Sequence, residues 1–179
     1  MKLLWLDLET TGLDPRGCKV LEVAVMQADI TEPFSALPLY HAVIPHDGTN
    51  LSPFILDMHT KNGLLEECAG IVALARSPVR IEDADAALAD LVPEAKSRSG
   101  MPVLAGSSIH FDHEFIKVHM PSFAKHLSHR HYDVSAVKLF CESIGMPPLP
   151  KAEAHRAQAD VLESINHAQR CADWVHHGT

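Results

Sequence analysis

The sequence is poor in cysteine and in basic residues. The cysteines lie far apart and form no C-x-x-C pair, which fits reduced thiols better than a disulfide framework or a zinc knuckle; they are Cys18, Cys68, Cys141 and Cys171. We expect them to be reduced thiols that serve in packing. Lys and Arg number 15 against 23 Asp and Glu, a formal net charge of −8. Bulk positive charge therefore cannot hold this chain on a long duplex, but short nucleic acids are not excluded.

Long apolar runs are also missing. No run reaches the roughly 20 residues that span a bilayer, and Lys2 and Asp7 interrupt the first run before a signal-peptide core could form. We therefore expect a cytoplasmic protein without membrane contact. Hydrophobic residues make up 46% and charged residues 21% of the 179 residues, which is ordinary for a globular chain. With no repeat in the sequence, we expect one domain over residues 1–179.

The order of apolar runs and amphipathic segments predicts an α/β fold. Strands are expected over residues 3–8, 20–30 and 39–44, as a meander, and again over 102–105 and 132–134. Helices are expected over residues 54–59, 64–75, 81–96 and 111–119, then up to 144 and finally over 155–174. This order favours a mixed five-stranded sheet flanked by helices.

Two carboxylates stand at the end of the first expected strand. Asp7 and Glu9 are two residues apart, so their side chains point to the same face. Like charges packed together are costly unless cations neutralise them, and oxygen ligands suit Mg²⁺ or Mn²⁺. Taken alone, such a pair is more often a solvent-facing strand end, because short motifs give many false positives.

Further candidate residues follow later in the chain. Asp112 lies just inside a helix that follows a strand, and Asp160 lies on the last helix, five residues after His155. His155 and Asp160 can face one cleft if the loop before the helix carries the histidine. Each also has another explanation, since Asp112 can complement a helix dipole, Asp160 can be surface charge, and His155 can be a cap or an exposed side chain.

In this order, the four acids and the histidine resemble the DEDDh family of 3′ to 5′ exonucleases. The first motif of that family, D-x-E-T-T-G, is found at 7–12, and the last, H-x-x-x-x-D, at 155–160. Within the family the resemblance is closest to the oligoribonucleases, and it continues in the expected order at 58–64, 106–109, 120–121, 133–135 and 156–165. The resemblance implies a ribonuclease H-like fold and a homodimer.

The residue types also fit two-metal phosphodiester hydrolysis. Two divalent ions about 4 Å apart, here Mg²⁺ or Mn²⁺, can polarise the scissile phosphate and stabilise the leaving oxygen, and several carboxylates are needed to hold them. We expect Asp7 to bridge the two ions and Glu9, Asp112 and Asp160 to complete the site. Because a neutral imidazole accepts a proton near neutral pH, His155 is the expected general base.

The resemblance further implies contacts to a short RNA held by its end. Leu13 is the expected base wedge and His59 is expected near the active site. Ser108, Arg130 and Ser135 are expected around a 5′ phosphate. The physical case is clearest for Arg130, because a guanidinium binds phosphate in a two-point fork. The alternatives are a surface ion pair for Arg130 and an N-cap for Ser108.

The sequence departs from the oligoribonuclease pattern at several positions. Phe54 stands where a Trp is usual, and His129 replaces a Tyr that is usually donated across the dimer interface; both can stack on a base. Thr10 replaces Met, as in the proofreading and ribonuclease T-like branch. His113 replaces Arg, and Phe111 replaces a polar residue. The catalytic class is unaffected by these changes.

We therefore expect a metal-dependent exonuclease that releases 5′-mononucleotides from the 3′ end of short RNA oligonucleotides. One alternative is a DEDDh exonuclease that trims longer single-stranded DNA or RNA, for which aromatic stacking matters more than a phosphate cap. A second alternative is an inactive module that only binds nucleic acid or a protein partner. The presence of all four acids and His155 argues against this second alternative.

Overall fold

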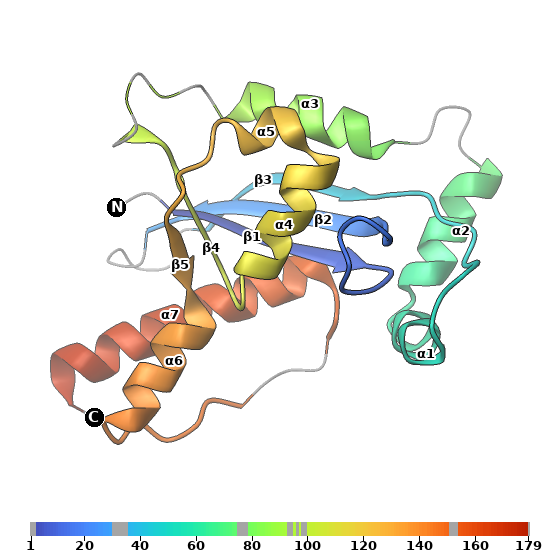
Figure 1. Cartoon of the computed structure of the whole chain (residues 1–179). Helices are drawn as coiled ribbons and strands as arrows, with labels where there is room; N and C mark the ends of the chain where they lie inside the picture. Colours follow the sequence, from blue (N-terminus) through green and yellow to red (C-terminus); the bar gives the residue numbers. More distant parts are fainter. Residues whose placement is uncertain are drawn as a thin grey trace.

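The chain forms a five-stranded sheet with helices on both faces (Figure 1). The computed structural model describes residues 3–29, 36–74, 79–92, 95, 97, 100–150 and 154–178. The strands are β1 (Leu3–Thr10), β2 (Val20–Ala28), β3 (Leu37–Val43), β4 (Val103–Gly106) and β5 (His131–Asp133). The helices are α1 (Pro53–Lys61), α2 (Leu64–Leu74), α3 (Ile81–Leu91), α4 (His110–His119), α5 (Pro121–Ala124), α6 (Val134–Ser143) and α7 (Ala157–His177).

The strand order is β3-β2-β1-β4-β5. The β1–β2 and β2–β3 pairs are antiparallel, whereas the β1–β4 and β4–β5 pairs are parallel. The expected meander and the expected mixed five-stranded sheet are therefore both confirmed. Gly106 is needed at the end of β4, because a Cβ there would lie 2.6 Å from the carbonyl oxygen of Leu6.

The central strand β1 is covered on both faces. Leu4 and Leu6 belong to a core with Ile116 of α4 and Phe123 of α5. The alternate residue Trp5 belongs to a second core that Val161 and other residues of α7 complete. The helices α3, α4 and α5 thus cover one face, and α7 covers the other with α6 beside it (Figure 1). The residues of β1 that alternate with Leu4 and Leu6 therefore face α7.

Several element boundaries differ from the expected ones. The helix α3 ends at Leu91, so the expected extension to residue 96 is wrong at residues 92 and 95. Residues 93, 94 and 96 lie outside the described residues, as do the expected strand end at 30 and the expected helix end at 75. Pro121 follows α4 but also begins the short helix α5, a position where proline is favoured. The last helix begins at Ala157, because His155 has a backbone φ of 46° and cannot start it.

The cysteines are free thiols, with Cys68, Cys141 and Cys171 buried and Cys18 half-buried, which confirms their expected packing role. Within the described ranges, no helix combines the length and apolarity needed to cross a bilayer. The single-domain span over 1–179 and the cytoplasmic location stay predictions.

Candidate active site

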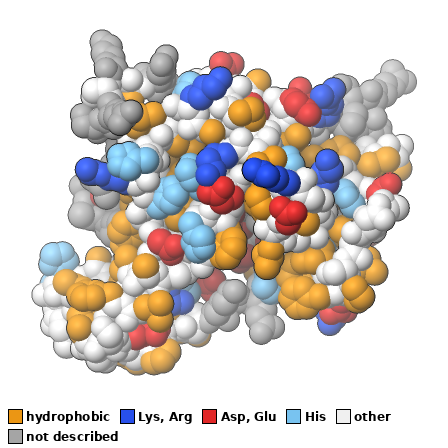
Figure 2. Space-filling view, viewed as in Figure 1, with side chains coloured by type: hydrophobic (Ala, Val, Ile, Leu, Met, Phe, Trp, Pro, Cys, Tyr) orange, Lys and Arg blue, Asp and Glu red, His pale blue; other side chains and the backbone are white. Residues whose placement is uncertain are grey.

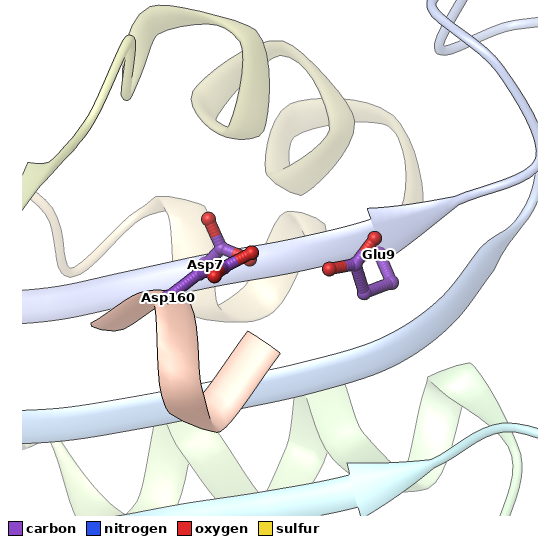
Figure 3. A group of neighbouring side chains, drawn as sticks. All are labelled: Asp7, Glu9 and Asp160. Carbon is purple, nitrogen blue, oxygen red and sulfur yellow. The ribbon is translucent and has the colours of Figure 1, made fainter. Parts of the chain in front are cut away.

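The first strand and the last helix together provide a cluster of three carboxylates. Asp7 and Glu9 alternate along β1, and Asp160 lies in the first turn of α7. One oxygen from each residue lies within 4.8 Å of the others. Figure 3 shows the Asp160 carboxylate beside that of Asp7, with Glu9 farther along the same strand. Carboxylate oxygens at this spacing could hold a hard divalent cation.

Asp112 adjoins this cluster from the opposite face of the sheet. It lies in the first turn of α4, and its Oδ1 accepts a hydrogen bond of 3.0 Å from the backbone N–H of Leu8. Its negative charge raises the pKa of both Asp7 and Glu9. Among the described residues it is not part of the three-oxygen group, but it lies within electrostatic reach of that group.

Burial and mutual repulsion oppose ionisation of these acids. Burial, followed by the charges of Asp112 and Glu9, raises the pKa of Asp7 well above its usual value. Burial and the charge of Asp160 raise the pKa of Glu9 to about 8. Burial is also the main reason that the pKa of Asp112 rises to about 7. A cation bound among these oxygens would favour their ionised form, so the donor set fits a divalent metal.

His155 lies in the loop immediately before α7, which is the placement that lets it share a cleft with Asp160. The side-chain amide of Asn62, which follows α1, donates a hydrogen bond to the His155 carbonyl. The same amide lies 3.5 Å from Nδ1 of His59. Asn62 therefore ties the end of α1 to the loop that carries His155.

His59 is fully buried beside the acids. Its Nε2 donates to the Thr10 carbonyl over 3.2 Å and lies 3.9 Å from Oε2 of Glu9. Burial is the main cause that lowers the pKa of His59, and the charge of His155 lowers it further. The structure thus places His59 next to the acid cluster, as the resemblance implies.

Two of the candidate residues have unusual backbone conformations. Of the described non-glycine residues, Asn50, Ser108 and His155 have positive φ, with values of 59°, 54° and 46°. Such conformations cost energy for residues other than glycine and asparagine and are concentrated at functional sites. Ser108 and His155 are therefore held in strained conformations by the structure around them.

A cavity of about 170 Å³ opens beside Asp7 and Asp112. Its polar lining comes from the two acids and from hydroxyl groups, and its apolar lining comes from β1, the following loop and α4. The lining residues are Asp7, Leu8, Thr10, Leu13, Ser107, Ser108, Phe111, Asp112 and Phe115. Leu13 is 79% exposed, so it stands at the cavity with most of its side chain open to solvent.

Ser108 and Ser135 lie together, as the expected phosphate site requires. Their Oγ atoms are 3.1 Å apart. The Asp133 carboxylate accepts hydrogen bonds from the backbone N–H groups of both residues, at 3.1 and 2.9 Å. Asp133 is the N-cap of α6, whereas Ile109 is the N-cap of α4, so the alternative N-cap role of Ser108 is wrong.

Three other expected substrate residues lie outside the cavity lining. His129 and Arg130 are exposed in the loop before β5. Phe54 is 72% exposed on α1. The roles of these three residues stay predictions.

Glu22, a buried carboxylate on β2, is a further residue of the site that was not predicted from the sequence. Glu22 pairs with Glu9 across the two strands and binds Arg156, the residue between His155 and α7. Its Oε2 also accepts the backbone N–H of Ala157 at 3.0 Å. The available signal was a single acid within a strand whose other residues are almost all apolar.

Comparison with proteins of known name places the chain in a family. It is 33% identical to the oligoribonuclease of Corynebacterium diphtheriae over 170 residues, which cover 92% of this chain and 78% of that protein. It is 35% identical to the oligoribonuclease of Mycobacterium ulcerans, covering 94% and 78%. The chain belongs to the oligoribonuclease family. The mitochondrial oligoribonuclease of Mus musculus is 33% identical, with 94% of this chain and 70% of that protein covered. No protein-family model matches the chain.

Solved structures of another protein share the fold of this member of the oligoribonuclease family. Escherichia coli exonuclease I in complex with a dT13 oligonucleotide gives a TM-score of 0.65 at 16% identity, over 98% of this chain and 43% of exonuclease I. The apo form of exonuclease I gives a TM-score of 0.62 at 17% identity, over 98% and 44%. The chain therefore spans less than half of exonuclease I. The expected ribonuclease H-like fold is confirmed.

Proposed function

We propose that this protein is a metal-dependent 3′ to 5′ exonuclease that releases 5′-mononucleotides from short RNA oligonucleotides. The observation that carries the proposal is the convergence of Asp7, Glu9 and Asp160 within 4.8 Å in a chain of the oligoribonuclease family. Two residues of β1 and one of α7 meet because α7 packs against β1, so residues about 150 positions apart in the sequence form one cluster.

We assign the metal site to the four acids. Asp7, Glu9 and Asp160 would bind two divalent cations, Mg²⁺ or Mn²⁺, with Asp112 beside them. When bound, such cations neutralise charge on the scissile phosphate and on the leaving 3′ oxygen. The buried carboxylates with raised pKa values support this assignment, because they are stabilised in the ionised form only when positive charge is supplied.

His155 is the proposed general base, which accepts the proton of the attacking water. Because His155 precedes α7, helical geometry does not determine its position relative to Asp160, which is five residues later. The Asn62 hydrogen bond to its carbonyl fixes the backbone at this point. A held backbone limits the positions that the imidazole can adopt, which favours proton transfer in one geometry.

The 5′ phosphate of a short substrate would be bound by Ser108, Ser135 and Arg130, whereas His129 would stack on a base. Two hydroxyl groups 3.1 Å apart and a guanidinium suit a phosphate. Figure 2 shows Lys, Arg and His side chains in a row across the middle of the face that α4 crosses. Asp and Glu side chains lie beside this row (Figure 2), so its Lys and Arg side chains offer individual contacts for the phosphates of a short anionic strand.

We further propose that the enzyme is a cytoplasmic homodimer. Within the described residues, α6 and the turn after it carry large exposed apolar side chains: Leu139 is 67%, Phe140 58% and Ile144 52% exposed. Neighbouring exposed apolar residues favour a protein interface. Sedimentation velocity tests this point, with Phe140→Glu expected to shift a dimer to the monomer.

Hydrolysis of an end-labelled oligonucleotide tests the main proposal. We expect a five-nucleotide RNA to release mononucleotides in order from its 3′ end when Mn²⁺ is added, and no release in EDTA. Asp160→Asn should abolish the release. Internal cuts, release from the 5′ end, or unchanged hydrolysis in EDTA would overturn the proposal, whereas binding without hydrolysis under all metals would favour the inactive module.

A further inference from the structure

Asp133 joins the two segments that carry the candidate phosphate contacts. Its Oδ1 accepts the backbone N–H of Ser108 at 3.1 Å and that of Ser135 at 2.9 Å. Ser108 lies in the turn between β4 and α4, whereas Ser135 lies in the first turn of α6. One carboxylate oxygen therefore holds two backbone groups that are 27 residues apart in the sequence.

The Ser108 backbone is held on both sides of its Cα. Its φ is 54°, a value that costs energy for a residue with a Cβ. The Ser108 N–H donates to Asp133, and the Ser108 carbonyl accepts the N–H of Phe111 at 3.0 Å. The second bond is local to the turn, so the first one fixes Ser108 relative to β5 and α6.

The hydroxyl groups of Ser108 and Ser135 are arranged for an anion with several oxygens. Their Oγ atoms are 3.1 Å apart, so one hydroxyl can donate to the other and one proton is left for a third group. A phosphate offers several acceptor oxygens, so both hydroxyls can turn and donate to it. The backbone need not move for this change, because Asp133 binds the N–H groups and leaves the hydroxyls able to rotate.

A carboxylate beside a phosphate site would repel the phosphate unless donors surround it. Oδ1 of Asp133 accepts backbone N–H groups at the start of α6, where the helix dipole favours a negative charge. Oδ2 lies 3.4 Å from Nδ1 of His110, so the imidazole can donate to it. Asp133 can therefore hold the site together, because these donors partly balance its charge.

We propose that Asp133 is a positioning residue for the 5′ phosphate of the substrate, which it does not touch itself. By holding Ser108 and Ser135, it fixes the phosphate site relative to the acids. Ser108 provides this link, because it lines the same cavity as Asp7 and Asp112. A fixed spacing favours oligonucleotides whose length matches it. The inference rests on the proposed exonuclease function and adds the residue that makes the 5′ phosphate contribute to binding.

Two RNA dinucleotides that differ only in the 5′ phosphate test the inference. We expect the wild type in Mn²⁺ to have an about tenfold lower KM for the phosphorylated dinucleotide, because hydrogen bonds to a charged phosphate strengthen binding. Asp133→Asn keeps an oxygen acceptor and should keep this preference. Asp133→Ser still caps α6, but its shorter side chain should not hold Ser108. Its KM should rise about tenfold for the phosphorylated dinucleotide alone, with kcat nearly unchanged.

Ala136→Gly is the matched control. Ala136 is exposed in the same first turn of α6, so glycine weakens the helix there and leaves the carboxylate in place. Its ratio of the two KM values should equal that of the wild type. A wild-type ratio in Asp133→Ser, an equal rise of KM for both dinucleotides, or the same loss of preference in Ala136→Gly would overturn the positioning role.

Calorimetric titration with the two dinucleotides in Ca²⁺ adds a readout that does not require hydrolysis. Ca²⁺ is a hard cation that oxygen ligands accept. We expect tighter binding of the phosphorylated dinucleotide by the wild type and by Asp133→Asn, and loss of this difference in Asp133→Ser. Equal affinity of the wild type for both dinucleotides would overturn the inference. Absence of hydrolysis by the wild type in Mn²⁺ would instead contradict the proposed function, and the titration would still decide the role of Asp133.

Discussion

Glu22 and Arg156 form a two-point ion pair that joins β2 to the start of α7. Nε of Arg156 donates to Oε2 of Glu22 over 3.0 Å, and its Nη2 donates to Oε1 over 3.1 Å. The Glu22 side chain is 1% exposed. Because Arg156 follows His155 directly, this pair determines where the candidate base enters the site and where the helix that carries Asp160 begins.

Breaking this pair should lower both stability and turnover. Arg156→Ala leaves the Glu22 carboxylate buried with fewer partners, so we expect a loss of about 3 kcal/mol in the free energy of unfolding. Glu22→Gln, which keeps the side-chain shape, should lower kcat about tenfold because the start of α7 is less firmly held. Urea denaturation and steady-state kinetics measure the two effects.

Glu67 supplies a matched control for this prediction. It also binds Nη2 of Arg156, at 2.8 Å, but its side chain is 45% exposed. Glu67→Gln should therefore cost less than about 1 kcal/mol and leave kcat nearly unchanged. Equal effects of Glu22→Gln and Glu67→Gln would show that the buried pair has no special positioning role.

Asp7→Asn should stabilise the metal-free protein while abolishing hydrolysis. The raised pKa of Asp7 means that its ionised form is unfavourable in the folded chain, so a neutral amide should add about 1 kcal/mol to the free energy of unfolding. The rise in Tm on adding Mn²⁺ should disappear. Thermal denaturation checks both effects, with Asp57→Asn as a surface control, because Asp57 is 63% exposed and pairs with Lys61. A lower Tm of metal-free Asp7→Asn would contradict this account.

Stability of the metal-free protein should fall as the pH rises. The pKa of Glu9 is raised from 4.5 to about 8 and that of Asp112 from 3.8 to about 7. Between the ordinary and the raised pKa values, the folded state holds protons that the unfolded chain has already released. The stabilisation that is fully present below the ordinary pKa values is therefore lost as the pH rises to about 7 for Asp112 and about 8 for Glu9. A divalent cation needs the ionised carboxylates, so the Tm increase with Mg²⁺ should be larger at about pH 8 than at about pH 5. A cation effect that is independent of pH would argue against these carboxylates as ligands.

His155→Ala should separate proton transfer from metal binding. We expect kcat to fall by about 10² to 10⁴, the range that general-base catalysis supplies, with little change in the Tm increase on adding Mn²⁺. His176→Ala, an exposed change in the last turn of α7, should leave both quantities unchanged. If His155→Ala keeps the wild-type rate at neutral pH, another group accepts the proton.

Much of the site follows from local sequence patterns. Alternation along β1 predicts that Asp7 and Glu9 share a face, and the loop before the last helix was the placement required for His155. The role of Glu22 could not be predicted in this way, because its partners Arg156 and His41 come from segments far away in sequence. The same holds for the contacts of Asp133 with Ser108 and His110, which come from a segment more than 20 residues earlier in the sequence.

Some helix boundaries could likewise not be predicted from the local sequence. Pro121 was expected only to stop a helix, but the carboxylate of Asp85 on α3 accepts the backbone N–H groups of Ser122 and Phe123 at 3.1 and 2.7 Å. These hydrogen bonds satisfy the free N–H groups at the start of α5. Within the four residues of α5, Pro121 is typical of a helix start, but the acid that caps the helix comes from a distant segment.

The proposed catalytic site for short RNA consists of four acids and His155. The most direct measurement compares the hydrolysis rates of a 5′-phosphorylated RNA dinucleotide and a long single strand, for the wild type and Asp160→Ala in Mn²⁺. We expect faster hydrolysis of the dinucleotide by the wild type and no hydrolysis of either substrate by Asp160→Ala. Much faster hydrolysis of the long strand, or full activity of Asp160→Ala, would contradict this proposal.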